Sequence, residues 1–410
     1  MSGWWRWVVT GSRSDGRSIA SGLQWVSPAR LCVVAAGGLS VLGIYGINLA
    51  SWPDAAAPAT LSEQTVKQFV FLGVGVLAAA AIIVPHPRWL SIAAWSLSTI
   101  AMALLVLLLL PGVPESLVSP INGTRAWIKL PGFNAQPSEL AKIAFVLLVA
   151  TLMKRSDEHR RFVGVCRLCA LAAMPMGLIA LQPDLGTASL FGPSLLAMLI
   201  AGGARLRHLC LLGVLALCLA PVSWTFLHDY QQERIVSLVR QLQGDRSGGQ
   251  DESFQSFTAQ RLIAAGGVSG LDAEQTRALV RFNRLPEAHN DMIPSVLMCR
   301  FGIRATLALL MGYALWVGGA LLTSAWSKDP FGRLVAVGLS AFIAGQALIN
   351  IGMNVGVLPI IGITLPFVSY GGSSLLTCWL MTGIVFGIGL RRPTPPIRPS
   401  FEYDGGHDSS

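Results

Sequence analysis

The sequence has very little charge for its length. Only 12% of its 410 residues are Asp, Glu, Lys or Arg, whereas 53% are hydrophobic. Soluble domains carry about 25% charged residues, so this shortage excludes an ordinary soluble enzyme. Across lipid, a segment must satisfy its own backbone hydrogen bonds, as a helix does. The composition therefore predicts an all-α polytopic membrane protein.

Acidic residues are scarcer than basic ones, and the formal net charge is +9. The basic residues concentrate in alternate loops between the apolar segments, as cytosolic loops do. We therefore expect both termini in the cytosol. Because this topology and anionic lipid account for the positive charge, it does not indicate nucleic-acid binding.

Cysteine is also sparse. The seven cysteines are an odd number and lie in or beside apolar segments, which favours packing over a disulfide framework. Cys166 and Cys169 form a C-x-x-C pattern without a neighbouring His or second pair, so it favours helix packing over metal binding. Residues 1–30 lack an apolar core followed by a small-residue cleavage site, and we expect no cleavable signal.

About ten apolar segments are predicted to cross the membrane. They lie at 31–51, 68–84, 89–111, 139–154, 164–181, 187–203, 206–226, 293–323, 334–350 and 370–390. We predict a cytosolic tail at 1–30, a membrane domain at 31–390 and a disordered cytosolic tail at 391–410. Between spans seven and eight, residues 227–292 form a large outer loop, in which 254–268 is predicted to be an amphipathic helix on the membrane.

The run from Asn350 to Leu376 contains five glycines and two prolines in otherwise apolar sequence. Broken backbone is tolerated at membrane depth only where protein or a water-filled cavity covers it. The run therefore predicts a site inside the protein.

Polar residues gather at further places on the predicted outer side. Glu139 and Lys142 lie one turn apart at the start of a span, and both a structural ion pair and a functional pair fit this spacing. In the turn at 182–187, Asp184 is expected to cap the next helix. Asp291 stands where span eight enters the bilayer, and it suits either a helix N-cap or a general base.

Several motifs occur in a fixed order. They are N-G-x-x-x-W at 122–127, Q-P-S-E-L-A-K at 136–142, Q-P-D-L-G-T at 182–187, Gln255-Ser256 with Gly266-Gly267, L-P-E-A-H-x-D at 285–291 and G-x-x-P-x-x-G-x-x-L-P-F-x-S-Y-G-G-S-S at 356–374. Together they closely resemble the SEDS family (shape, elongation, division and sporulation), whose members include RodA and FtsW. The resemblance covers about residues 120–376.

The resemblance implies a peptidoglycan glycosyltransferase of the bacterial cytoplasmic membrane, acting in elongation or division. Such enzymes polymerise lipid II at the outer face with inversion at the sugar and release undecaprenyl diphosphate. It also implies a class B penicillin-binding protein transpeptidase as partner. A divalent cation, Mg²⁺ or Mn²⁺, is expected, although no residue can be assigned to it.

The resemblance also implies site residues. The family's essential Asp corresponds to Asp291, which would act as the base, and its paired Glu and Lys correspond to Glu139 and Lys142. The basic candidates for the diphosphate are Lys142, Arg125 and Arg261, since positive charge stabilises such a leaving group. The full set of candidate substrate-binding residues is Arg125, Gln136, Ser138, Glu139, Lys142, Arg261, Ser369, Ser373 and Ser374.

The chain departs from the family after Asp291. Two positions that are usually acidic are Cys299 and Arg300, and a charged residue within a span needs a partner, for which Asp184 and Glu139 are candidates. Two alternatives to an active polymerase therefore stay open: a catalytically weakened paralogue acting as a scaffold, and a lipid II flippase. A flippase requires alternating access, whereas the polar residues concentrate on the outer side.

Overall fold

The structure is a computed structural model. It describes residues 27–51, 61–114, 116–118, 124–130, 132–224, 232–233, 236, 239, 243, 251–283 and 285–391. The predicted tails at 1–30 and 391–410 lie almost wholly outside these residues, as does the first part of the loop 227–292.

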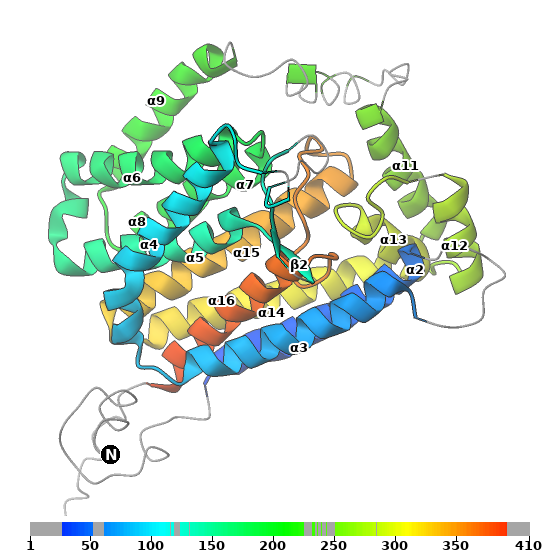
Figure 1. Ribbon diagram of the computed structural model, residues 1–410, viewed down its shortest axis with the longest axis horizontal. Helices are drawn as coiled ribbons and strands as arrows, with labels where there is room; N and C mark the ends of the chain where they lie inside the picture. The colour runs from blue at the N-terminus through cyan, green and yellow to red at the C-terminus, as the bar shows by residue number, and fades with distance from the viewer. Residues whose placement is uncertain are drawn as a thin grey trace, which may run out of the picture.

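Helices make up nearly all of the described chain (Figure 1). They are α2 (Ala29–Ala50), α3 (Glu63–Ile83), α4 (Pro87–Leu109), α5 (Pro137–Arg155), η2 (Asp157–Arg160), α6 (Phe162–Ala180), α7 (Leu185–Ser189), α8 (Phe191–Ala201), α9 (Leu206–Trp224), α11 (Asp251–Gly266), α12 (Ala273–Phe282), α13 (Ile293–Phe301), α14 (Ile303–Trp326), α15 (Pro330–Asn354) and α16 (Gly372–Leu390). A short antiparallel hairpin, β1 (Ile128–Leu130) with β2 (Phe133–Ala135), precedes α5.

The all-α polytopic fold is confirmed. Among the described residues, seven helices are long and apolar enough to cross a membrane, namely α2, α3, α4, α6, α14, α15 and α16. Helix α5 has a suitable length but carries more charge, and α8 is short. Every predicted span coincides with one helix or with two consecutive helices.

Two spans predicted as continuous are interrupted in the structure. In the segment 187–203 the interruption between α7 and α8 is the single residue Leu190, which keeps helical backbone angles. The segment 293–323 is broken at Gly302, between α13 and α14. Gly302 has a φ of +61°, which favours glycine, and a Cβ there would lie 2.5 Å from Val268 O. The break therefore lets the chain pack closely against the connection between α11 and α12.

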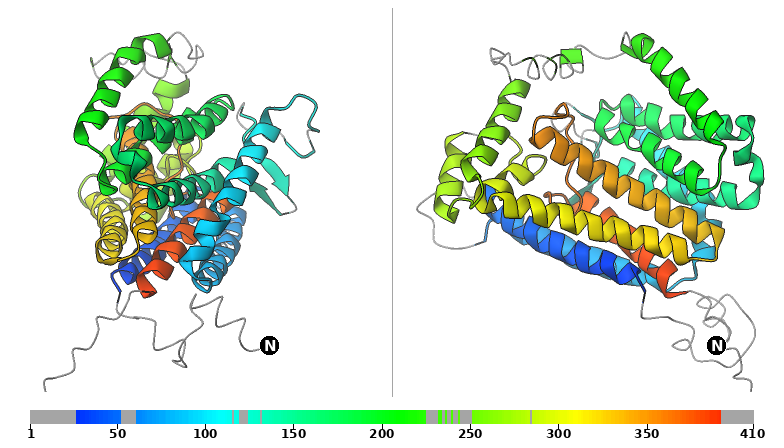
Figure 2. Two further views of the ribbon diagram at one scale, coloured as in Figure 1. Left: turned by 90° about the vertical axis from the view of Figure 1, so that its left-hand side faces the viewer. Right: turned by 180° about the vertical axis from the view of Figure 1, so that it is seen from behind.

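The predicted helix at 254–268 exists as α11, which packs against α13. Close backbone contact explains the glycine at its end, since a Cβ on Gly266 would lie 2.3 Å from Met298 O. Figure 2 shows α11 and α12 beside the end of the bundle at which α2 and α15 finish. Whether α11 lies on the membrane stays a prediction.

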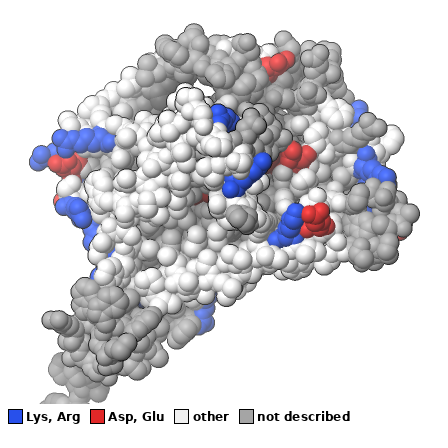
Figure 3. Space-filling model, viewed as in Figure 1, with Lys and Arg blue, Asp and Glu red and all other residues white. Residues whose placement is uncertain are grey.

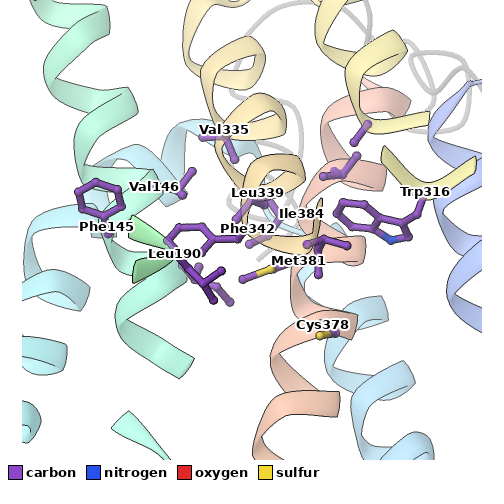
Figure 4. Close-up of a cluster of buried hydrophobic side chains, with 14 of the residues drawn as sticks. Phe145, Val146, Leu190, Trp316, Val335, Leu339, Phe342, Cys378, Met381 and Ile384 are labelled. Carbon is purple, nitrogen blue, oxygen red and sulfur yellow. The ribbon is translucent and has the colours of Figure 1, made fainter. Parts of the chain in front are cut away.

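The core lies between α5, α8, α15 and α16. Three phenylalanines from α5, α8 and α15 pack edge to face, with ring centroids 5.2 to 6.4 Å apart; they are Phe145, Phe191 and Phe342. Figure 4 shows apolar side chains of α5, α14, α15 and α16 meeting in this core. Aromatic pairs of this kind add about 0.5–1.5 kcal/mol each beyond burial. This core packs α5, α15 and α16 against one another, and the site lies at the ends of these helices.

The two ends of the bundle differ chemically. At one end, Lys154 of α5 pairs with Asp329 at 2.9 Å, and Arg391 donates to the carbonyl of Val84 at 2.7 Å. At the other end, α5 and α16 begin and α15 finishes. Figure 3 shows charged side chains at one margin and over the opposite half of this face, with a broad uncharged band between them. This distribution suits a protein that spans a membrane.

Candidate active site

Buried polar side chains gather where α5 and α16 begin and α15 ends. Glu139 and Lys142 of α5 are 4% and 1% exposed, and Lys142 Nζ lies 2.8 Å from Glu139 Oε1. The Lys142 ammonium also donates to Gln346 Oε1 of α15 at 3.1 Å. The Gln346 amide in turn donates to the carbonyl of Thr364 at 3.0 Å. The Glu139–Lys142 pair thus begins a hydrogen-bond network that reaches the glycine- and proline-rich segment between α15 and α16.

Helix α15 presents a polar stripe to this network. Gln346, Asn350 and Asn354 recur every four residues, which places them on one face of the helix, and all are buried. None of the three is among the site residues predicted from the sequence. Their signal was present, since three amides at this spacing stand in a span that is otherwise apolar.

The stripe holds the backbone of Asp291. Both Asn350 Nδ2 and Asn354 Nδ2 donate to the Asp291 carbonyl, at 3.0 and 2.9 Å. The N-cap of α13 is Met292, so Asp291 does not cap this helix. Its carboxylate faces Gly362, where a Cβ would lie 3.6 Å from Asp291 Oδ2. Two side chains of α15 therefore fix the backbone of Asp291, the predicted base, and its carboxylate is directed toward Gly362.

The two preceding carbonyls are held as well. Ser369 Oγ donates to the Asn290 carbonyl at 2.7 Å, and the Tyr370 N–H donates to the His289 carbonyl at 2.9 Å. Burial lowers the pKa of His289, which favours its neutral form, and its ring packs edge-on against Tyr370. Three consecutive carbonyls are thus bound by α15 and by the segment between α15 and α16.

A second group of contacts ties α5 to α7 and α16. Gln136 donates its N–H to Ser373 Oγ at 3.1 Å and its side-chain amide to Asp184 at 3.2 Å. Asp184 accepts from the Thr187 N–H at 2.9 Å, which confirms it as the N-cap of α7. Ser374 Oγ lies 3.2 Å from Thr364 Oγ1. The predicted residues Gln136, Ser373 and Ser374 are therefore brought together.

Buried polar atoms at the site leave hydrogen-bonding capacity unused. Within the described part of the chain, four of them lack a hydrogen-bond partner: Ser138 Oγ, Glu139 Oε2, Asn290 Oδ1 and Asn354 Oδ1. The Asn354 amide cannot be turned around, because its nitrogen faces two carbonyl oxygens. Such buried atoms normally find a partner, and a polar ligand can supply one.

The predicted basic residues are not all brought to this network. Arg125 is half-buried before β1, and Arg261 is exposed on α11. Asn122 and Gly123 of the first motif lie outside the described residues. The expectation for Arg300 was wrong, since its partners are neither Asp184 nor Glu139. It donates to Tyr45 Oη at 3.0 Å and to the Leu271 carbonyl at 2.7 Å, because it points toward α2 and the α11–α12 connection.

The described residues offer no metal site made of side chains with strong ligands. Groups of three or more His, Cys, Asp or Glu side chains that could hold a metal ion are absent from this part of the protein. The expected divalent cation stays a prediction, and no chemical step is assigned to it.

Known proteins resemble this chain over most of its length. A family model described as "Cell cycle protein" (FtsW/RodA/SpoVE) matches residues 30–392. The chain is 36% identical over 273 residues to the Escherichia coli protein named "Peptidoglycan glycosyltransferase MrdB", covering 66% of this chain and 72% of the relative. It is 34% identical over 332 residues to "Stage V sporulation protein E" of Bacillus subtilis, covering 78% and 86%.

A similar fold occurs in a solved structure titled "Structural coordination of polymerization and crosslinking by a peptidoglycan synthase complex". The TM-score is 0.73 at 27% identity, and the alignment covers 89% of this chain and 98% of that chain.

Proposed function

The chain belongs to the FtsW/RodA/SpoVE family, and on this premise we propose that it is a peptidoglycan glycosyltransferase that polymerises lipid II. The resemblance to the SEDS family drawn from the motifs agrees with this membership. One observation carries the proposal beyond the family name: the peptide group of Asp291 is held by two buried asparagines, and its carboxylate faces a glycine.

In the proposed reaction, the Asp291 carboxylate accepts the proton of the 4-hydroxyl of the acceptor sugar. The hydroxyl oxygen attacks the anomeric carbon of the donor with inversion, and undecaprenyl diphosphate leaves. General bases of this kind contribute about 10²–10⁴-fold to a rate when they are well positioned. Gly362 is exposed and lacks a side chain, which leaves room for a hydroxyl beside Asp291.

Binding of the diphosphate is proposed for Lys142, Arg125 and Arg261. Lys142 already donates to Glu139 and Gln346, so its charge is partly neutralised within the protein. The two arginines are therefore the more available cations. Contacts with the sugars or their carrier are proposed for the six remaining candidates, Gln136, Ser138, Glu139, Ser369, Ser373 and Ser374. The divalent cation would bind the diphosphate itself.

The protein is a multi-pass membrane protein, and the bacterial cytoplasmic membrane with both termini in the cytosol is its proposed location. The end of the bundle that carries Lys154, Arg160 and Arg391 would then face the cytosol, and the site would face outward. The similar solved structure concerns a complex that couples polymerisation to crosslinking, which supports a class B penicillin-binding protein as partner.

A fixed site on one side of the membrane suits a polymerase better than a flippase. Hydrogen bonds join α5, α15, α16 and the segment before α13 at one end of the bundle. A transporter would have to break such contacts as its site changes sides. The polymerase is therefore the function that we advance.

The test compares wild type with Asp291→Asn on labelled lipid II, with Mg²⁺ or Mn²⁺ and the transpeptidase partner, and resolves the glycan strands on a gel. Asp272→Asn is the matched control, because Asp272 caps α12 by accepting from the Gln275 N–H and asparagine caps equally well. We expect strands from wild type and from the control only. Equal strands from Asp291→Asn would refute the proposed base, and none from wild type would refute the polymerase.

A further inference from the structure

Helix α3 sends one polar side chain toward the site. Most of its surface is exposed, and its buried residues are Thr65, Gln68, Gly75 and Ala79. Gln68 is 1% exposed. Polar groups within a membrane-spanning helix are costly, and those that face the protein interior commonly serve a function. Gln68 belongs to the part of the chain for which the family motifs assign nothing.

The Gln68 amide binds the chain on both sides of Tyr370. Its Nε2 donates to the Ser369 carbonyl at 3.1 Å, and its Oε1 accepts from the Gly371 N–H at 3.3 Å. Because one partner is an acceptor and the other a donor, the amide has one orientation that satisfies both. The side chain thus replaces a neighbouring strand for this short stretch of backbone.

A second residue of α3 packs against the same stretch. Phe71 lies one turn beyond Gln68, and a Cβ on Gly372 would lie 3.0 Å from three of its ring carbons. The Phe71 ring also lies 6.4 Å from that of Tyr370. Helix α3 therefore holds residues 369–372 by a polar and an apolar contact.

The stretch that Gln68 binds is the one that holds the peptide groups before Asp291. Ser369 Oγ donates to the Asn290 carbonyl, and the Tyr370 N–H donates to the His289 carbonyl. Two layers of hydrogen bonds therefore join Gln68 to the segment that ends in Asp291. Displacement of the stretch would move the carboxylate, while the asparagines of α15 would still hold its carbonyl.

We propose that Gln68 is a positioning residue for Asp291. It contacts neither substrate nor reacting atoms, and it acts by fixing residues 369–371, which in turn fix the backbone before the base. The inference rests on the proposed polymerase function. A misplacement of about 1 Å at a reacting group can cost about 10²-fold in rate, so a remote residue of this kind can have a large effect on turnover.

Two substitutions separate the hydrogen bonds from the volume of the side chain. Gln68→Met has a similar length and lacks both hydrogen-bonding groups. Gln68→Glu has the same shape, and when protonated its O–H can donate to Ser369 and its carbonyl can accept from Gly371. Burial favours the protonated acid, which loses its proton as the pH rises. Val70→Ala is the control, because Val70 lies on the same helix and is 59% exposed.

Steady-state polymerisation of lipid II would be measured between pH 6 and 8, beside thermal unfolding of each variant. We expect Gln68→Met to lower kcat by about 10- to 100-fold, with KM within about twofold of wild type, because substrate contacts remain. Relative to wild type, Gln68→Glu should regain activity as the pH falls. Val70→Ala should match wild type.

Hydrogen exchange gives a readout that does not depend on turnover. The Gly371 N–H should exchange faster in Gln68→Met than in wild type, because it loses its acceptor. Unchanged kcat in a folded Gln68→Met would overturn the proposal, as would equal losses in both variants at every pH. Faster exchange with inactive wild type would instead remove the proposed function, and the role in positioning the base with it.

Discussion

The buried pair of Glu139 and Lys142 allows a sharp prediction about stability. Their side chains are 5% and 2% exposed, and the charged atoms are 2.8 Å apart. Replacing Lys142 by Met leaves the Glu139 carboxylate buried without its cation, which costs about 3–5 kcal/mol. Gln346 also loses a donor to its oxygen, which adds about 1 kcal/mol. The sum is a large part of the stability of about 5–15 kcal/mol found for folded proteins.

The assay is thermal unfolding of the purified protein in detergent. The double variant Glu139→Gln with Lys142→Met carries no stranded charge, so it should unfold between the single variant and wild type. Lys154→Met is the control. Lys154 also lies on α5, but at the exposed end of this helix, where it pairs with Asp329. Such exposed pairs are worth about 0–1 kcal/mol. Equal shifts for Lys142→Met and Lys154→Met would refute the reasoning.

The polymerisation rate of the double variant shows whether the pair has a role besides stability. If the pair serves the reaction, as its position in the network indicates, the double variant should stay below about one tenth of the wild-type rate even though its stability is partly restored. Recovery of both stability and activity would show that the pair only holds α5 against α15.

Two further predictions concern the frame around the site. Asn354→Leu removes one of two donors to the Asp291 carbonyl. In polymerisation assays with labelled lipid II it should lower kcat by about tenfold and leave KM nearly unchanged. A wild-type rate would contradict this prediction. Gly302→Ala places a side chain at a φ of +61°, which should lower the free energy of unfolding by about 1–3 kcal/mol through backbone strain and further through the contact with Val268 O. Its thermal unfolding midpoint should therefore fall. Gly318→Ala, in open space on α14, should not lower it, and equal behaviour of the two would refute the packing argument.

Sequence patterns predicted the helices well, because apolar composition over about 20 residues directly reflects the thickness of a bilayer. They also indicated that Gln136, Ser369 and Ser373 belong to one site. They could not predict the partners, because those contacts join residues far apart in the chain, as Gln68 and Ser369 do across 301 positions. The break at Gly302 could not be predicted either, because one glycine barely changes the mean hydropathy of an apolar run.

Cys299 and Arg300 stand at two positions where the resemblance to the SEDS family implies acidic residues. Cys299 packs in an apolar cluster that joins α11, α12 and α13 and also contains Met292 and Met353, and Arg300 binds Tyr45 and the Leu271 carbonyl. The Asp291 carbonyl is held from the other side, by Asn350 and Asn354 of α15. The hydrogen bonds of Arg300 share no residue with those that hold the Asp291 carbonyl, so an arginine at this position anchors the α11–α12 connection without removing a donor to that carbonyl. This separation favours an active polymerase over a scaffold that has lost its chemistry.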